Sequence, residues 1–250
     1  MRAGIVYKSG EVLSEVLSFL KSKGVECFAF EKPTDELEDF DFIVSIGGDG
    51  TVLRILQEVK KCPPIFGINL GRIGLLTHSS PSDFKEKLEI AMRNFEVEEF
   101  MRLNCRIGDD ELLALNEIAV FNVEVAKLVT IGIEVDGVEI DRIRCDGLIV
   151  ATQIGSTGYA FSSGGPVVDP YLESIIVTPV APFRFGWKPW VFKSNRVIRV
   201  DVDKEVYVIA DGQKRIKTSG RITIAKSRYP AVFFKKNRIE ELAKKVKRIE

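Results

Sequence analysis

The chain has 250 residues, enough for two domains of ordinary size, and its balance of 45% hydrophobic and 29% charged residues is typical of a soluble globular protein. Lys plus Arg and Asp plus Glu both total 36, so the chain has no net charge that would attract nucleic acid or an anionic membrane. No apolar run approaches the ~20 residues that span a bilayer, and the N-terminus has no signal-peptide pattern, so we expect a cytoplasmic protein with no nucleic acid or membrane partner.

Strand and helix patterns alternate over the first hundred residues. Apolar runs predict strands at 3–7, 25–30, 41–46 and 65–69, with 25–30 and 41–46 buried. Helical spacing predicts helices over 11–23, 51–61 and 80–95. In the last of these, Ser80 is the expected N-cap, Pro81 the first helical residue and Asp83 close to a capping-box position. This alternation predicts a parallel sheet covered on both faces.

The period changes near residue 100. Strands are predicted at 102–107, 112–121, 128–135, 138–144, 147–152, 174–180, 196–202, 206–210 and 221–225, with no strong helical pattern between residues 100 and 230. Residues 237–249 return to helical spacing and are expected to pack back on the first domain. We therefore expect an α/β domain over 1–99, joined by about 231–250, and an all-β, sandwich-like domain over 100–230.

The cysteine and glutamine content bears on metal and disulfide chemistry and on the temperature of the host environment. The four cysteines, Cys27, Cys62, Cys105 and Cys145, are scattered singly without CxxC spacing, which argues against a metal centre or a disulfide framework. Only three Gln residues stand against 22 Glu, a bias typical of proteins from hot environments.

This bias predicts an apparent unfolding midpoint above the ~45–65 °C at which ordinary mesophile domains unfold. Scanning calorimetry measures it. A midpoint inside that range would contradict the hot-host interpretation and leave the functional interpretation untouched.

The stretch VSIGGDGTVLR, residues 44–54, lies between a predicted buried strand and a helix. Gly47, Gly48 and Gly50 allow a cradle of backbone amides for a phosphate at the helix N-terminus. The stretch is neither a Walker-type loop nor GxGxxG. Asp49 would repel a phosphate placed directly on it, so it either accepts a proton from a hydroxyl, binds Mg²⁺ beside phosphates, or caps the helix. The residues alone do not decide among these roles.

Four motifs then carry a family resemblance. GGDGT at 47–51 is similar to the signature shared by NAD kinases and by the diacylglycerol and sphingosine lipid kinases. GINLGRIGLLT at 67–77, LNEIAV at 115–120 and DGLIVATQIGSTGYAFSSGGP at 146–166 resemble NAD kinase motifs and follow in order. The chain therefore resembles the NAD kinase family.

The resemblance implies a fold, a reaction and partners. The fold would be a nucleotide-binding-like α/β domain followed by a β-sandwich, with the active site in the cleft between them. The reaction would transfer a phosphoryl group from ATP or polyphosphate to the 2′-hydroxyl of the adenosine ribose of NAD, giving NADP, with Mg²⁺ required. The enzyme would be a homodimer or homotetramer built through the β-domain.

The resemblance also implies roles for single residues. Asp49 would orient or deprotonate the ribose hydroxyl while the Gly47–Gly50 amides hold donor phosphates. Asn116 and Glu117 would bind the adenosine end of NAD, although an Asn-Glu dipeptide is also common in β-domains. The remaining matched binding positions are Asp146, near the nicotinamide, and Thr157, Tyr159 and Ser162. Considered without the motif, Tyr159 would more often be a core residue than a ligand contact.

Other polar residues have two open readings. Arg54 either meets a phosphate or covers its helix, and Arg144, with Arg142, forms a basic pair that could accompany a pyrophosphate. The preferred interpretation of ADGQ at 210–213 is a hairpin turn, and the alternative is that Gln213 contacts the nucleotide. The run 233–238 is expected to be a solvated face, and His78 a surface or supporting residue rather than a catalytic one.

Three positions depart from the family pattern. Gln153 and Ile154 stand where Pro and Thr are expected, and Phe183 stands where the family usually has His.

Two rival functions are a lipid kinase with the same GGDGT loop and a regulatory NAD(P)-binding module without turnover. Formation of NADP from NAD and ATP distinguishes all three.

Overall fold

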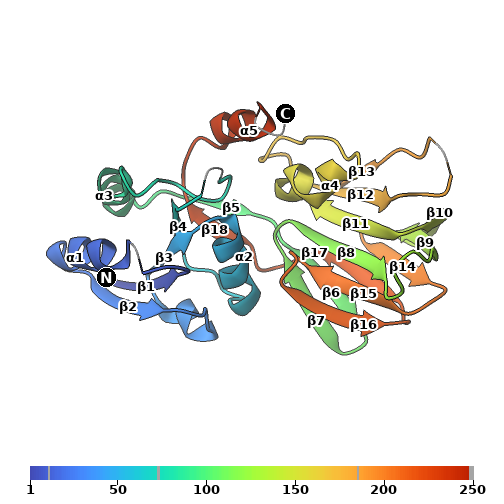
Figure 1. Cartoon of the computed structure of the whole chain (residues 1–250), viewed down its shortest axis with the longest axis horizontal. Coiled ribbons are helices and arrows are strands. Elements are labelled where there is room, and N and C mark those ends of the chain that lie inside the picture. Colours follow the sequence, from blue (N-terminus) through green and yellow to red (C-terminus); the bar gives the residue numbers. More distant parts are fainter. Residues whose placement is uncertain (11, 72–73, 185, 248–250) are drawn as a thin grey trace. The chain divides into compact units, whose positions relative to one another are not determined.

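The computed structural model describes residues 1–10, 12–71, 74–184 and 186–247. The chain divides into two compact units, Met1–Glu99 with Tyr229–Glu250, and Phe100–Arg228. The first is an α/β unit with a mostly parallel sheet, and the second consists of antiparallel sheets (Figure 1). The predicted fold class is therefore confirmed.

The first unit is built on a six-stranded sheet of order β2-β1-β3-β4-β18-β5. Its strands are β1 (Arg2–Tyr7), β2 (Glu26–Phe30), β3 (Phe42–Gly47), β4 (Ile65–Asn69), β5 (Val97–Phe100) and β18 (Ala231–Phe234). Its helices are α1 (Leu13–Ser22), η1 (Asp35–Asp39), α2 (Asp49–Glu58), α3 (Phe84–Asn94) and α5 (Arg238–Lys247). Because β18 pairs in parallel with β4, the C-terminal segment returns to the first unit as predicted. Residues 248 and 249 of the predicted tail helix lie outside the described residues.

The central strands of this sheet position the glycine-rich motif. Every residue of β3 is buried, as expected for a parallel strand covered on both faces. Helices α1 and α3 share one apolar cluster with β1, β3 and β4, while α2 buries Val52, Ile55 and Leu56 and contacts β3 and β4. The end of β3, where the glycines begin, is thereby fixed by packing.

Two local predictions in this unit are wrong. The run 25–30 was expected to be a buried strand, but only Val25 is buried, and the residues of the edge strand β2 itself are half-buried or exposed. Helix α3 begins at Phe84 rather than Pro81. Ser80 donates from its amide and its hydroxyl to Asp83 Oδ1, at 2.7 and 2.8 Å, which closes a turn before the helix.

The second unit contains two six-stranded sheets, β10-β9-β14-β17-β6-β7 and β13-β12-β11-β8-β15-β16. The strands of the first are β6 (Leu103–Ile107), β7 (Asp110–Ala114), β9 (Val129–Val135), β10 (Val138–Cys145), β14 (Ile198–Val202) and β17 (Ile222–Lys226). Those of the second are β8 (Glu117–Asn122), β11 (Gly147–Thr152), β12 (Ser174–Val180), β13 (Trp190–Lys193), β15 (Val206–Ala210) and β16 (Lys214–Thr218). Buried side chains of both sheets form one sandwich core.

Two predictions in this unit also need correction. The strand expected over 112–121 is two strands in different sheets, with Leu115 and Asn116 between β7 and β8. No helix was expected here, yet η2 (Ile154–Thr157) and α4 (Tyr159–Ser162) follow β11. Elements of four residues are too short to show a helical period.

The short helices cover one face of the second sheet. β11 is buried along its whole length, because the sandwich core lies on one side of it and a smaller apolar cluster that includes Ala160 lies on the other. In the described part of the chain, no helix combines the length and the apolar character needed to cross a bilayer.

Candidate active site

The glycine motif joins β3 to α2. Gly47 ends β3, Gly48 is the N-cap of α2, and Asp49 and Gly50 lie in its first turn. A Cβ on Gly47 would lie 2.1 Å from Thr51 Oγ1, so packing excludes a side chain there. A Cβ on the exposed Gly50 would meet nothing within 4 Å. Gly50 therefore borders open space at the N-terminus of α2, where an anionic group could lie.

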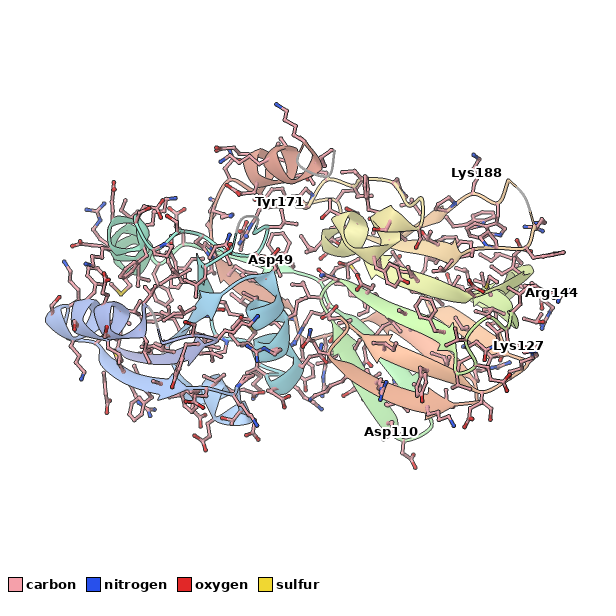
Figure 2. All side chains as sticks on the ribbon, in the orientation of Figure 1. Asp49, Asp110, Lys127, Arg144, Tyr171 and Lys188 are labelled. Atoms are coloured by element: carbon pink, nitrogen blue, oxygen red, sulfur yellow. The ribbon has the colours of Figure 1, made fainter. Side chains whose placement is uncertain are left out.

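Asp49 does not cap its own helix. Its Oδ2 accepts a hydrogen bond from the Leu75 amide at 2.9 Å, and its Oδ1 accepts one from the Leu76 amide at 3.0 Å. Figure 2 shows Asp49 at the start of α2. The helix-capping interpretation is wrong. The two amides fix the carboxylate, and each oxygen keeps a lone pair for a further partner.

The motif at 67–77 supplies these amides. Asn69 pairs with Gly47 in the sheet, and its Oδ1 accepts a hydrogen bond from Gly71 N at 2.9 Å. A Cβ on Gly67 would lie 2.8 Å from Thr77 Cα, so the backbone must pass close by. Residues 72 and 73 of this motif lie outside the described residues.

His78 is a supporting residue of this segment. Its Nδ1 accepts a hydrogen bond from Gly67 N at 3.0 Å, so the proton is on Nε2, which donates to the Phe234 carbonyl at 2.7 Å. Its ring stacks on Phe66 at 4.9 Å between centroids. Burial lowers the pKa of His78 well below its ordinary value, so the imidazole is neutral.

The run 233–238 is not a solvated face, contrary to the prediction. Phe233, Phe234 and Arg238 are buried, and the Lys236 side chain is only 15% exposed. Burial, followed by the charge of Arg238, lowers the pKa of Lys236 to about 8. The run was misread because its first two residues, Phe233 and Phe234, belong to β18, which lies between β4 and β5 in the sheet.

The Asn-Glu pair of the second unit is held by Asp211. Oδ1 of Asp211 accepts from the amides of Asn116 and Glu117 at 2.7 and 3.1 Å, and Oδ2 accepts from the Leu115 amide at 2.8 Å. Burial raises the pKa of Asp211 to about 6, against the lowering effect of these amides. Sequence reasoning missed Asp211, because an Asp before Gly in a predicted turn gives no signal beyond the turn itself.

The long motif lies directly on this pair. The Thr152 amide donates to the Asn116 carbonyl at 2.8 Å, and a Cβ on Gly155 would lie 2.1 Å from the same oxygen. A Cβ on Gly158 would lie 3.1 Å from Glu117 Oε2. Residues 152–158, which include η2, and the Asn-Glu pair therefore form one compact cluster.

The other matched residues of this motif lie beside the cluster. The Tyr159 ring is stacked 5.7 Å from that of Phe121 and is 44% exposed, so it is no core residue. Ser162 is exposed on α4. Gln213 follows the turn at Asp211, and its Nε2 donates to the Asp211 carbonyl at 3.3 Å.

Buried polar atoms around η2 lack partners. Among the described residues, no hydrogen bond reaches Gln153 Oε1, Thr157 Oγ1 or Thr178 Oγ1. A buried polar atom left unpaired costs about 1–3 kcal/mol, so each of these atoms calls for a further partner, such as a bound ligand or a water molecule.

The structure does not bring Arg144 and Asp146 to this cluster. Strand β11 pairs Ala151 with Glu117 but Gly147 with Phe121, a separation of about 13 Å at ~3.3 Å per residue. Arg144 is exposed (Figure 2). Its guanidinium lies 5.3 Å from the centre of the Phe183 ring.

The two remaining arginines belong to different units, Arg142 to the second and Arg54 to the first. Arg142, the expected companion of Arg144, pairs instead with Glu139 at 3.2 Å. Arg54 is half-buried on α2 and makes no hydrogen bond or ion pair within the part of the chain that the structure describes.

Two further features of the described residues bear on ligands. No group of three or more His, Cys, Asp or Glu side chains that could hold a metal ion is found among them. A cavity of about 380 Å³ in the first unit is lined mainly by α3, α5 and the end of β18, and none of the predicted site residues lines it.

Comparisons with known proteins agree with this geometry. Residues 11–94 match the ATP-NAD kinase N-terminal domain, and residues 115–236 match the ATP-NAD kinase C-terminal domain. The chain is 58% identical to the NAD kinase of Archaeoglobus fulgidus over 250 residues, which cover both chains completely. It is 37% identical to the NAD kinase of Methanosarcina barkeri, over 93% of this chain and 89% of that protein.

Solved structures give the same result. A crystal structure of an Archaeoglobus fulgidus NAD kinase in complex with ATP matches with a TM-score of 0.96 and 57% identity over the whole of both chains. A yeast NADH kinase complexed with NADH matches with a TM-score of 0.85 over 99% of this chain and 86% of that chain. At 21% identity, this second likeness shows the fold alone.

Proposed function

Because the chain belongs to the NAD kinase family and is an enzyme of that type, we propose how its own residues divide the reaction among them. The 2′-hydroxyl of the adenosine ribose of NAD is the acceptor and NADP the product. The lipid kinase and the regulatory module find no support in the comparisons.

The observation that carries the proposal is the placing of Asp49. Its carboxylate is held by the Leu75 and Leu76 amides, in the first turn of α2, where Gly50 borders open space. Phosphoryl transfer depends on such fixed groups, because positioning and electrostatics supply most of the catalysis. Asp49 orients the ribose hydroxyl and accepts its proton, and the first turn of α2, with Arg54 beside it, holds donor phosphates.

ATP is the proposed phosphoryl donor, supported by the ATP complex of the related enzyme, with polyphosphate as a second donor. Mg²⁺ would be held here mainly by the donor phosphates, with Asp49 as the carboxylate beside them, because no group of three or more His, Cys, Asp or Glu side chains is found among the described residues. It would neutralise charge on those phosphates.

The second unit supplies recognition of NAD. Asn116 reads the adenine edge, Glu117 holds the ribose diol, and Thr157, Tyr159, Ser162 and Gln213 surround them. The unpaired Thr157 Oγ1 and the exposed Tyr159 ring support this assignment. Arg144 and Asp146 contact a more distant part of the ligand, and the resemblance alone suggests a homodimer or homotetramer in the cytoplasm.

Initial rates with every pairing of ATP or polyphosphate with NAD or NADH test the proposal. We expect ATP with NAD to give the highest kcat/KM and chelation of Mg²⁺ to abolish turnover. Turnover that persists with excess chelator would contradict the role of Mg²⁺, and polyphosphate outperforming ATP would contradict the proposed donor.

Two alanine substitutions in the glycine motif should change the stability of the protein in opposite directions. Gly50→Ala fills only open space and favours the helix, so stability should rise by about 0.4–1 kcal/mol. The same methyl group crowds the donor phosphates, and an overpacking cost of about 1–3 kcal/mol would lower kcat/KM for ATP roughly 5- to 150-fold. Thermal unfolding and steady-state kinetics measure both.

Gly47→Ala is the matched control. Its Cβ would lie 2.1 Å from Thr51 Oγ1, so it should lower stability, by about 1–3 kcal/mol. Wild-type kcat/KM in Gly50→Ala would show that no ligand uses the open space.

A further inference from the structure

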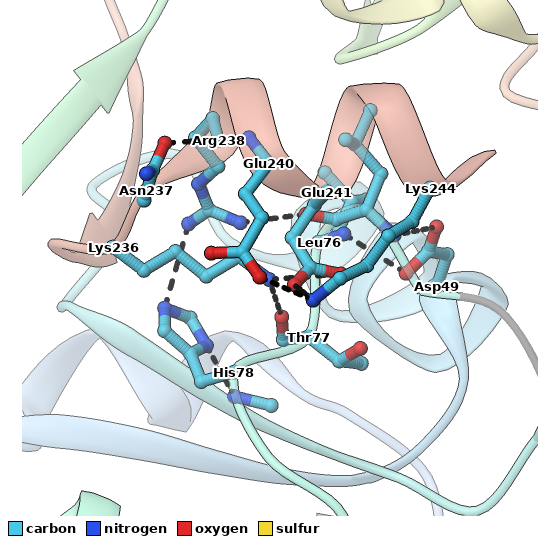
Figure 3. A network of polar contacts seen from close by, with 12 residues as sticks. Asp49, Leu76, Thr77, His78, Lys236, Asn237, Arg238, Glu240, Glu241 and Lys244 are labelled. Atoms are coloured by element: carbon cyan, nitrogen blue, oxygen red, sulfur yellow. Dashed lines mark hydrogen bonds and ion pairs between the residues drawn. The ribbon is translucent and has the colours of Figure 1, made fainter. Parts of the chain in front are cut away.

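The start of α5 holds the segment that orients Asp49. Arg238 NH1 donates to the Leu75 carbonyl at 2.7 Å, and Lys236 Nζ donates to the Thr77 carbonyl (Figure 3). These contacts span more than 150 residues of sequence. The segment they reach, Leu75 to His78, is the one whose amides bind Asp49.

A single peptide group connects Arg238 to Asp49. The Leu75 carbonyl and the Leu76 amide belong to the same planar peptide, and the carbonyl accepts from Arg238 while the amide donates to Asp49 Oδ1 at 3.0 Å. Because the plane is rigid, a rotation that breaks one contact breaks the other. Hydrogen bonds in such a chain also polarise one another.

The Thr77–His78 peptide is also held on both sides by hydrogen bonds. The His78 amide donates to the Gly67 carbonyl at 2.7 Å, while the Thr77 carbonyl of that peptide accepts from Lys236. One side of the segment is therefore tied to β4 and to Asp49, and the other side to two cations of the C-terminal segment.

The burial of the two cations is not explained by a contribution to stability. The Arg238 side chain is 1% exposed, and its Nε donates to Glu98 Oε1 at 2.5 Å. Buried ion pairs contribute little net stability, because desolvation offsets the attraction. Burying Lys236 carries a similar cost, so the arrangement is better explained by where these donors point.

We propose that Arg238 and Lys236 are positioning residues for phosphoryl transfer: Arg238 holds the Leu75–Leu76 peptide that binds the Asp49 carboxylate, and Lys236 holds the Thr77–His78 peptide of the same segment. The inference rests on the proposed role of Asp49. It predicts that the C-terminal segment affects the chemical step without contacting NAD or ATP.

Lys236→Met tests this, since it removes the donor to the Thr77 carbonyl and keeps the apolar stem. We expect a folded variant of somewhat lower thermal stability, because the carbonyl loses its partner, with unchanged KM for NAD and ATP. Its kcat should fall about 10- to 100-fold, because misplacement by 1 Å can cost ~10²-fold. Lys235→Met is the matched control. Lys235 is exposed and pairs with Glu96 at 3.5 Å, so its kcat should stay at the wild-type value.

Arg238→Lys is the second variant. It keeps a positive charge for Glu98 but loses the fork that also reaches Leu75, so kcat should fall while both KM values hold. In an Asp49→Ala background the same change should have no further effect, because both act through one carboxylate.

The outcomes separate the two proposals. Full turnover in Asp49→Ala alone would overturn the role of Asp49. Loss of turnover in Asp49→Ala, with wild-type kcat in both Lys236→Met and Arg238→Lys, would overturn only the positioning role. Lower stability of the cation variants with unchanged kcat, or independent effects in the double variant, would also overturn it.

Discussion

Asp49→Asn should lower turnover by about 10²- to 10⁴-fold, the range that positioned acid–base groups contribute. The amide cannot accept the ribose proton. It also turns an NH₂ group toward one of the two backbone amides that the carboxylate now binds, Leu75 or Leu76. NAD affinity should persist, because the residues assigned to NAD lie in the second unit. Turnover and NAD affinity are measured on one preparation.

Two controls separate charge from position. Asp49→Glu keeps the charge but moves it by one methylene, so it should also lose most turnover if orientation matters. Asp41→Asn removes an exposed carboxylate that accepts the Arg2 amide at the other end of β3, and it should leave turnover unchanged. Asp49→Asn with more than about a tenth of wild-type turnover would fall outside the predicted range.

Asn116→Ala should weaken NAD binding by about 10- to 10³-fold. A lost hydrogen bond contributes about 0.5–1.5 kcal/mol, and an adenine edge left unpaired adds about 1–3 kcal/mol. The fold should persist, because Asp211 and Thr152 bind the backbone of Asn116 and not its side chain. Titration calorimetry with NAD measures the affinity.

Asn104→Ala is the control for this variant. Asn104 lies in the same unit on β6, and its side chain binds Glu111 at 2.8 Å, so its loss should leave NAD affinity unchanged. Wild-type affinity in Asn116→Ala would show that the Asn-Glu pair is only a structural corner between β7 and β8.

The fold class could be predicted because it depends on periodicity. The change from alternating strands and helices to strands alone is visible in the sequence near residue 100, and β3 reads as a buried strand because both its faces are covered. Edge strands give no such signal. β2 contains as many apolar residues as a buried strand. It is exposed because it lies at the edge of the sheet, where β1 is its one neighbouring strand.

The site was predictable only where a motif is local. The glycines around Asp49 can be recognised from their sequence motif. The partners of its carboxylate cannot, since Leu75 and Leu76 bind it through backbone amides, which almost every residue has. Asp211 and Arg238 were missed for a related reason. Each works through contacts more than 90 residues away in sequence, and its own neighbourhood is that of a turn or a basic run.

The central claim is that phosphoryl transfer occurs onto the adenosine 2′-hydroxyl of NAD, assisted by Asp49. Its most direct test is ³¹P NMR of a reaction that contains the purified protein, ATP, Mg²⁺ and NAD, with Asp49→Ala run in parallel. We predict that a ribose 2′-phosphomonoester and ADP form in equal amounts with the wild type, and that neither accumulates with the variant or with a 2′-deoxyadenosine analogue of NAD. ADP accompanied only by inorganic phosphate, a phosphomonoester at another hydroxyl, or an equal yield from Asp49→Ala would contradict it.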